Sequence, residues 1–150
     1  MFKHILVPVD GSTTALAAVD KAIGLAKAFD SAVTIIYVID PYPFTGVGAD
    51  FAYGQDQYLT AATAEANTAI KTASERMAAQ GVQAESRVVE SHAIWRGVLE
   101  ASDAAGADLI VMGSHGRRGL EKLVLGSVTQ SVLSHSKITT LVVRNCEVKV

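Results

Sequence analysis

The chain has 150 residues, 49% of them hydrophobic and 19% charged, a composition that excludes extensive disorder and fits one domain over residues 1–150. Its formal net charge of −2 provides no overall basic excess for binding nucleic acid, and its single cysteine excludes an internal disulfide. No apolar run approaches the roughly 18 residues of a membrane span, and no signal-peptide pattern precedes the first apolar segment, so we expect a cytoplasmic protein with no membrane span and no nucleic-acid partner.

Five short apolar segments alternate along the chain with stretches of helical periodicity. The segments are rich in Val and Ile, a pattern typical of parallel strands that helices cover on both faces. Arg87 makes the third segment the most polar, which favours a position near a sheet edge. In chain order the predicted strands are residues 5–9, 33–39, 86–89, 109–112 and 141–143.

Between these segments, apolar residues recur at spacings of three and four, which predicts amphipathic helices. We expect Ser12 and Ser91 to cap the first and third helices, and Gly81 and Gly106 to end the second and third. Strand–helix alternation predicts an open, mostly parallel α/β sheet of about five strands with right-handed crossovers. The predicted helices cover residues 13–29, residues 58–79, a stretch marked by Ile94, Val98 and Ala101, and residues 127–134.

Residues 40–57 form the one stretch that the sequence predicts to be irregular. It contains Pro41, Pro43 and three glycines among several aromatic residues. A loop of this length inside a compact domain is usually functional or mobile. The alternative interpretation is a disordered connection with aromatic side chains on the surface, and the sequence alone leaves both open.

Two segments are candidates for a ligand site, because ligands of open parallel sheets collect beyond the carboxyl ends of the strands. Residues 8–12 follow the first strand and residues 113–119 follow the fourth. From the residues alone, Asp10 is equally well explained as a turn residue and as a ligand contact. His115 is expected to use its backbone N–H in a loop, and we assign no catalytic residue.

The second segment has properties that suit a phosphate group. Gly113 and Gly116 allow the main chain to approach a ligand closely. Gly126 and Ser127 open the fourth helix, where unpaired N–H groups and the positive end of the helix dipole attract an anion. Hydroxyl groups of Ser127 and Thr129 are further candidate donors. The pattern differs from the P-loop and from the dinucleotide-binding glycine motif.

With these residues in view, the chain resembles the universal stress protein family from about Lys3 to Arg144. The spacing Gly113-x2-Gly116-x9-Gly126-Ser127 is similar to that of the family members that bind ATP. The resemblance is carried by residues 5–12, 38–40, 107–117, 126–129 and 141–144.

The resemblance implies a five-stranded parallel sheet of order 3-2-1-4-5 with two helices on each face, a Rossmann-like fold similar to that of adenine nucleotide α-hydrolases. It implies bound ATP, ADP or AMP, with Mg²⁺ on the phosphate oxygens and no metal ligands from the protein. It also implies a homodimer through the last strand, from Thr140 to Arg144, which agrees with the hazard of an open apolar edge. The implied nucleotide-binding residues are Pro8, Val9, Asp10, Val38, Met112, Gly113, His115, Gly116, Gly126, Ser127, Val128 and Thr129.

The function that follows is an ATP-binding regulatory module of the stress response, acting on an unidentified protein partner as a nucleotide-occupied homodimer. Hydrolysis usually needs a residue that orients water and a dedicated metal carboxylate, so we expect little or no turnover. Two alternatives remain open: a slow ATPase or nucleotide α-hydrolase-type enzyme, and a nucleotide-free interaction protein.

Overall fold

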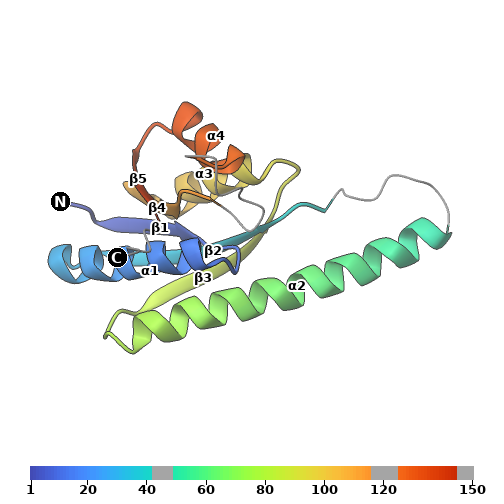
Figure 1. Cartoon of the computed structure of the whole chain (residues 1–150), viewed down its shortest axis with the longest axis horizontal. Helices are drawn as coiled ribbons and strands as arrows, with labels where there is room; N and C mark the ends of the chain where they lie inside the picture. The colour runs from blue at the N-terminus through green and yellow to red at the C-terminus, as the bar shows by residue number, and fades with distance from the viewer. Residues whose placement is uncertain (42–48, 116–124, 145–150) are drawn as a thin grey trace, which may run out of the picture.

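The computed structural model describes residues 1–41, 49–115 and 125–144, and the side chains of these ranges except residues 49–53. Its centre is a parallel sheet in the order β3-β2-β1-β4-β5 (Figure 1). This arrangement confirms the fold class and strand order expected from the sequence, with the polar β3 at one edge. The strands are β1 His4–Pro8, β2 Ala32–Ile39, β3 Ala84–Glu90, β4 Leu109–Gly113 and β5 Thr139–Val143.

Four helices cover the two faces of this sheet. Figure 1 shows α1 and α2 on one face and α3 and α4 on the other, as the resemblance implies. No helix within the described ranges is both long and apolar enough to cross a membrane. The helices are α1 Thr13–Phe29, α2 Ala49–Ala78, α3 Ile94–Ala105 and α4 Ser127–His135.

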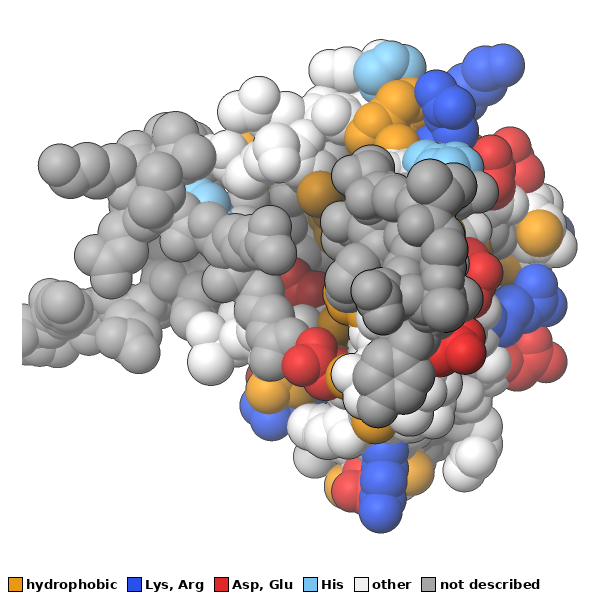
Figure 2. Space-filling view, turned by 90° about the vertical axis from the view of Figure 1, so that its right-hand side faces the viewer, with side chains coloured by type: hydrophobic (Ala, Val, Ile, Leu, Met, Phe, Trp, Pro, Cys, Tyr) orange, Lys and Arg blue, Asp and Glu red, His pale blue; other side chains and the backbone are white. Residues whose placement is uncertain are grey.

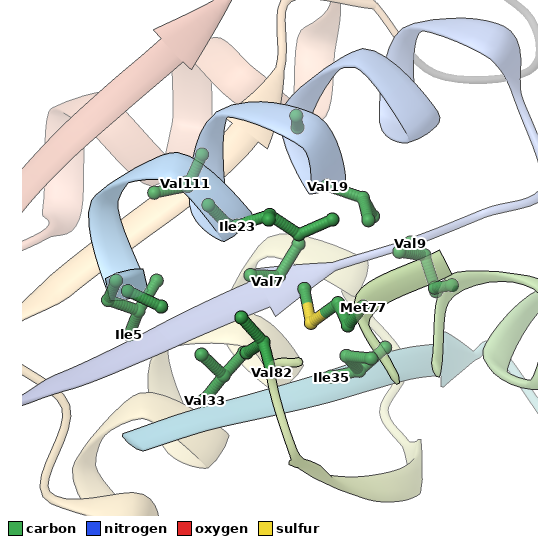
Figure 3. Packing of buried hydrophobic residues seen from close by; sticks show 14 of the residues in the cluster. Ile5, Val7, Val9, Val19, Ile23, Val33, Ile35, Met77, Val82 and Val111 are labelled. Carbon is green, nitrogen blue, oxygen red and sulfur yellow. The ribbon is translucent and has the colours of Figure 1, made fainter. Parts of the chain in front are cut away.

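Each face of the sheet has its own hydrophobic core, because neighbouring residues of a strand point to opposite faces. Ile5 and Val7 of β1 pack with α1 and α2, whereas Leu6 between them packs with α3 and α4. Figure 3 shows Met77 of α2 close to Val7 and Ile35 in the first of these cores. Full burial of one such side chain contributes about 1.5–3 kcal/mol, so the two cores hold the strand ends in fixed positions.

The structure confirms three of the four residues predicted to cap or end helices and corrects one. Ser12 Oγ accepts a hydrogen bond from Ala15 N–H at 3.1 Å, and Gly81 and Gly106 have the positive φ angles of left-handed turns. The expected cap at Ser91 is wrong. α3 begins only at Ile94, after the N-cap Ala93, and Ser91 Oγ instead donates to the Ala93 carbonyl oxygen at 2.9 Å.

The long helix α2 begins at Ala49, so the expectation of an irregular stretch through residue 57 and a helix starting at residue 58 is wrong. Two side chains attach this part of the helix to the end of β2: Tyr58 Oη donates to the Asp40 carbonyl oxygen at 3.1 Å, and Gln55 Nε2 donates to that of Pro41 at 3.3 Å. These tertiary contacts offset the cost of a helical Gly54, about 1 kcal/mol relative to alanine. Residues 42–48 lie outside the described residues.

Candidate functional site

The candidate site lies where the order of the strands reverses. β1 pairs with β2 on one side and with β4 on the other, so the crossovers on its two sides run in opposite directions. Pro8 ends β1, and Val9 continues the pairing through an N–H bond to the Ile36 carbonyl oxygen at 2.8 Å. Val38 lies near the end of β2 and Met112 near the end of β4, both buried. The structure therefore brings these predicted site residues to one edge.

The turn between β1 and α1 is built by three consecutive residues. Asp10 Oδ1 accepts a hydrogen bond from Ser12 N–H at 2.9 Å, which forms an Asx-turn. Gly11 has a φ of +83°, a conformation that disfavours other residues. The turn interpretation of Asp10 is thus confirmed, and its half-buried side chain lies at the sheet edge where the resemblance places a ligand.

Gly113, at the end of β4, is required by packing between elements far apart in the sequence. A Cβ atom added at Gly113 would lie 2.7 Å from Thr14 Cγ2 and 3.1 Å from the Thr14 carbonyl carbon and oxygen. The first turn of α1 therefore occupies the space that a side chain at Gly113 would need. Sequence reasoning missed this role, because it attributed the glycine to the approach of a ligand.

Gly97, a residue of α3, likewise leaves room for a neighbouring element. A Cβ atom added there would lie 2.8 Å from Val38 Cγ1 and 3.0 Å from Ser91 Cβ. The close approach of α3 to the end of β2 thus depends on this glycine. No sequence signal beyond the glycine itself marks it.

The start of α4 presents main-chain donors. Gly126 is the N-cap, with φ −71° and ψ 163°, and no side chain of the described residues caps the helix there. The N–H groups of Ser127 and Val128 belong to the first turn, where a helix offers no internal acceptor. With the positive end of the helix dipole, such groups favour a bound anion. This part of the predicted cradle has the expected geometry.

Thr129 acts within the structure rather than as a free donor. Its side chain is 2% exposed, and its Oγ1 donates to the Gly113 carbonyl oxygen at 2.9 Å. Gly126 N–H donates to the Ser114 carbonyl oxygen at 2.7 Å. These two bonds tie the end of β4 to the start of α4, so both sides of the candidate cradle are held together.

His115 follows Ser114, whose carbonyl oxygen accepts the Gly126 N–H. Its Nδ1 lies 3.1 Å from Oγ of the buried Ser114, whose N–H donates to the Val143 carbonyl oxygen at 2.8 Å. The ring is thereby held by its neighbour at the edge of the sheet. Gly116, the next predicted site residue, lies outside the described residues.

The electrostatic character of this end of the molecule is mixed. Figure 2 shows acidic and basic side chains interspersed over the described surface of one end. Among the described residues, no three His, Cys, Asp or Glu side chains form a cluster that could hold a metal ion.

Comparisons with known proteins agree with the resemblance seen in the sequence. The universal stress protein family profile matches residues 1–144. Universal stress protein MJ0531 of Methanocaldococcus jannaschii is 35% identical over 144 residues, covering 96% of this chain and 83% of that protein. The structure of hypothetical protein MJ0577 superposes with a TM-score of 0.84 at 26% identity, covering 97% of this chain and 98% of that one. A universal stress protein solved in complex with cAMP superposes with a TM-score of 0.66 at 28% identity, covering 95% and 96% of the two chains.

Proposed function

This chain belongs to the universal stress protein family, and we propose that it is a stress-response module that binds ATP at the carboxyl edge of β1, β2 and β4. The observation that carries the proposal is the start of α4, where the N-cap is a glycine and no side chain within the described ranges caps the first-turn amides. Support from a relative comes from the universal stress protein solved with cAMP, an adenine nucleotide.

The proposed arrangement assigns different parts of the edge to different parts of the nucleotide. The amides of Ser127 and Val128 bind phosphate oxygens, and the buried hydroxyl of Thr129 positions the Gly113 carbonyl beside them. Asp10 and Val38 lie toward the base, as the family resemblance implies. Mg²⁺ accompanies the phosphates and neutralises part of their charge when bound. ADP and AMP share the adenosine contacts and compete for the same site.

A glycine substitution at the start of α4 tests this placement. Gly126 has an extended backbone conformation that any residue adopts, so Gly126→Val leaves the fold intact and places a branched side chain before the amides. We expect at least a tenfold loss of ATP affinity by calorimetry, equivalent to about 1.4 kcal/mol.

Gly24→Val serves as the matched control, because a Cβ atom added at Gly24 of α1 meets nothing within 4 Å. This variant should bind ATP like the wild type. Unchanged affinity in folded Gly126→Val would contradict the placement. Failure of the wild type to bind ATP, ADP, AMP or cAMP would contradict the function itself.

We propose that the nucleotide acts through occupancy rather than turnover. The described part of this edge carries amide donors, a Thr129 hydroxyl already bonded to a carbonyl, and an Asp10 carboxylate that accepts the Ser12 N–H. Incubation with ATP and Mg²⁺, with phosphate, AMP and pyrophosphate measured, tests this. Turnover above about 1 s⁻¹, the low end for ordinary enzymes, would instead favour an ATPase or α-hydrolase.

We also propose a homodimer through β5. This strand is an edge of the sheet, and its Leu141 is 39% exposed. An open edge with an apolar side chain favours pairing with a second strand. Leu141→Lys should shift sedimentation toward the monomer, whereas Val88→Lys on the opposite edge strand, where Val88 is 40% exposed, should not. A monomeric wild type at tens of micromolar would reject the dimer.

A further inference from the structure

A groove of about 360 Å³ lies between the first turn of α1 and the middle of α2. Its lining includes Val9 and Tyr37, which pack with the core beneath α1 and α2, whereas Val38 packs with the core on the other face. The groove therefore lies on the face of the sheet opposite α3 and α4. It shares only the β1–α1 turn, with Val9 and Asp10, with the residues assigned to the nucleotide.

The groove combines an apolar base with oxygen atoms at its rim. Val9, Tyr37 and Ala69 supply the apolar part. Two threonines of α2 lie at the rim with their hydroxyl protons already used: Thr68 Oγ1 donates to the Ala64 carbonyl oxygen and Thr72 Oγ1 to that of Thr68, each at 3.0 Å. Each of these oxygens therefore faces a ligand only as an acceptor.

The charged side chains in the described lining of the groove are all negative. Asp10 and Glu65 carry carboxylates, and the described residues that line the groove include no Lys, Arg or His. A ligand that complements this lining has hydrogen-bond donors and a positive charge. An ammonium group supplies both, with three N–H donors, and the face of an aromatic ring such as Tyr37 adds attraction for a cation.

The two walls of the groove are held at a fixed separation. One helical turn beyond Leu16 and Thr72, Asp20 of α1 and Arg76 of α2 form a two-pronged ion pair, with Nε–Oδ1 at 2.6 Å and Nη2–Oδ2 at 2.8 Å. The groove is therefore formed before any ligand binds, which reduces the entropy lost on binding.

We propose that this groove binds a small organic ammonium compound, with its apolar body on Tyr37 and Ala69 and its N–H donors directed to Glu65, Thr68 and Thr72. The volume lies at the lower end of the roughly 300–1,000 Å³ of small-molecule sites, which suits a ligand with one ring. This site adjoins the proposed nucleotide site, with which it shares Val9 and Asp10, and its occupation does not require a nucleotide.

Three probes with a common body test the chemistry: 2-phenylethylamine, 2-phenylethanol and 3-phenylpropionate. Each is titrated into nucleotide-free, ¹⁵N-labelled protein, and the amide signals of Gly11, Thr68 and Thr72 are followed. We expect saturable shifts with the amine, at least tenfold weaker binding of the alcohol, and no saturation with the carboxylate. Equal binding of all three probes, or no binding of the amine, would overturn the proposal.

Paired variants of α2 test the location. Glu65→Gln keeps the shape and removes the charge, and should weaken amine binding several-fold. Glu75→Gln, on the same helix and outside the groove, should leave it unchanged. Thr68→Phe fills the groove and should abolish binding, whereas Thr63→Phe, also exposed on α2, should not. Amine binding that survives both Glu65→Gln and Thr68→Phe would place the ligand elsewhere.

Discussion

The amino and carboxyl edges of the parallel sheet differ in whether a side chain bonds their main-chain N–H groups. At the amino edge, the Asp108 carboxylate accepts from Lys3 N–H at 2.9 and 3.1 Å and from His4 N–H at 3.0 Å. Ala32 N–H donates to the Lys3 carbonyl oxygen, and Asp108 N–H to that of His4. At the carboxyl edge, Gly126 N–H donates to the Ser114 carbonyl oxygen, but no side chain of the described residues caps the first turn of α4. A carboxylate thus bonds the main chain at the amino edge, whereas the start of α4 has amides that we propose bind a ligand.

Residues that lie in the segments of the family resemblance have different structural roles. Asp108 and Gly113 both belong to the segment that carries the family resemblance, yet both have internal partners: the amides of β1 for Asp108 and the first turn of α1 for Gly113. Gly126 also has an internal partner, the Ser114 carbonyl oxygen, but it precedes amides that no side chain of the described residues caps. We therefore expect residues of one motif to serve stability and the proposed binding separately.

The largest stability effect is expected at Gly113. Gly113→Ala forces its Cβ against Thr14 Cγ2 and the Thr14 backbone, so unfolding in urea should show a loss of about 1–3 kcal/mol. Adding Thr14→Ser removes the methyl group and should recover part of the loss. Gly126→Ala should change stability by less than about 0.5 kcal/mol. Similar losses of unfolding free energy in Gly113→Ala and Gly126→Ala would contradict a packing role specific to Gly113.

A smaller effect is expected at Thr129. Thr129→Ala removes the donor to the buried Gly113 carbonyl oxygen and should cost about 1 kcal/mol of unfolding free energy. Thr129→Ser keeps the hydroxyl and should retain most of the stability. If Thr129→Ala weakened ATP binding without any loss of stability, the hydroxyl would act on the ligand directly.

The smallest effect is expected at the amino edge. The N–H groups of Lys3, and then of His4, lower the pKa of Asp108 below its ordinary value of 3.8, against the opposing effect of partial burial. The carboxylate thus stabilises the folded state fully above about pH 4, and this contribution disappears as the pH falls through the lowered pKa. Because solvent still reaches this half-buried group and screens its charge, we expect about 0.5 kcal/mol at neutral pH.

Denaturation of wild type and Asp108→Asn across this pH range measures the effect. The difference in stability should be present at neutral pH and vanish in strong acid. Asp103→Asn, an exposed aspartate of α3, serves as the control. A difference that grows as the pH falls would have the wrong sign for a lowered pKa.

The sequence predictions were wrong at the start of α2, where contacts across the fold override local preference, and at Ser91, where the local turn differs from the expected one. The start of α2 was placed too late because Gly54 and nearby aromatic residues suggest a loop, whereas Tyr58 and Gln55 bind the end of β2. Ser91 has the right side chain for a cap, but the chain turns once more before α3 begins. Neither contact leaves a trace in the spacing of residues.

The sequence by itself determined the alternation of strands and helices, the order of the strands once the family resemblance is used, and the caps at Ser12 and Gly106. These features depend on local periodicity and on the conformational preferences of single residues. Only the tertiary structure decided that Gly113 makes room for α1, that Thr129 holds a carbonyl, and that α1 and α2 enclose a groove. Each of these depends on distances between residues far apart in the chain, which no local pattern records.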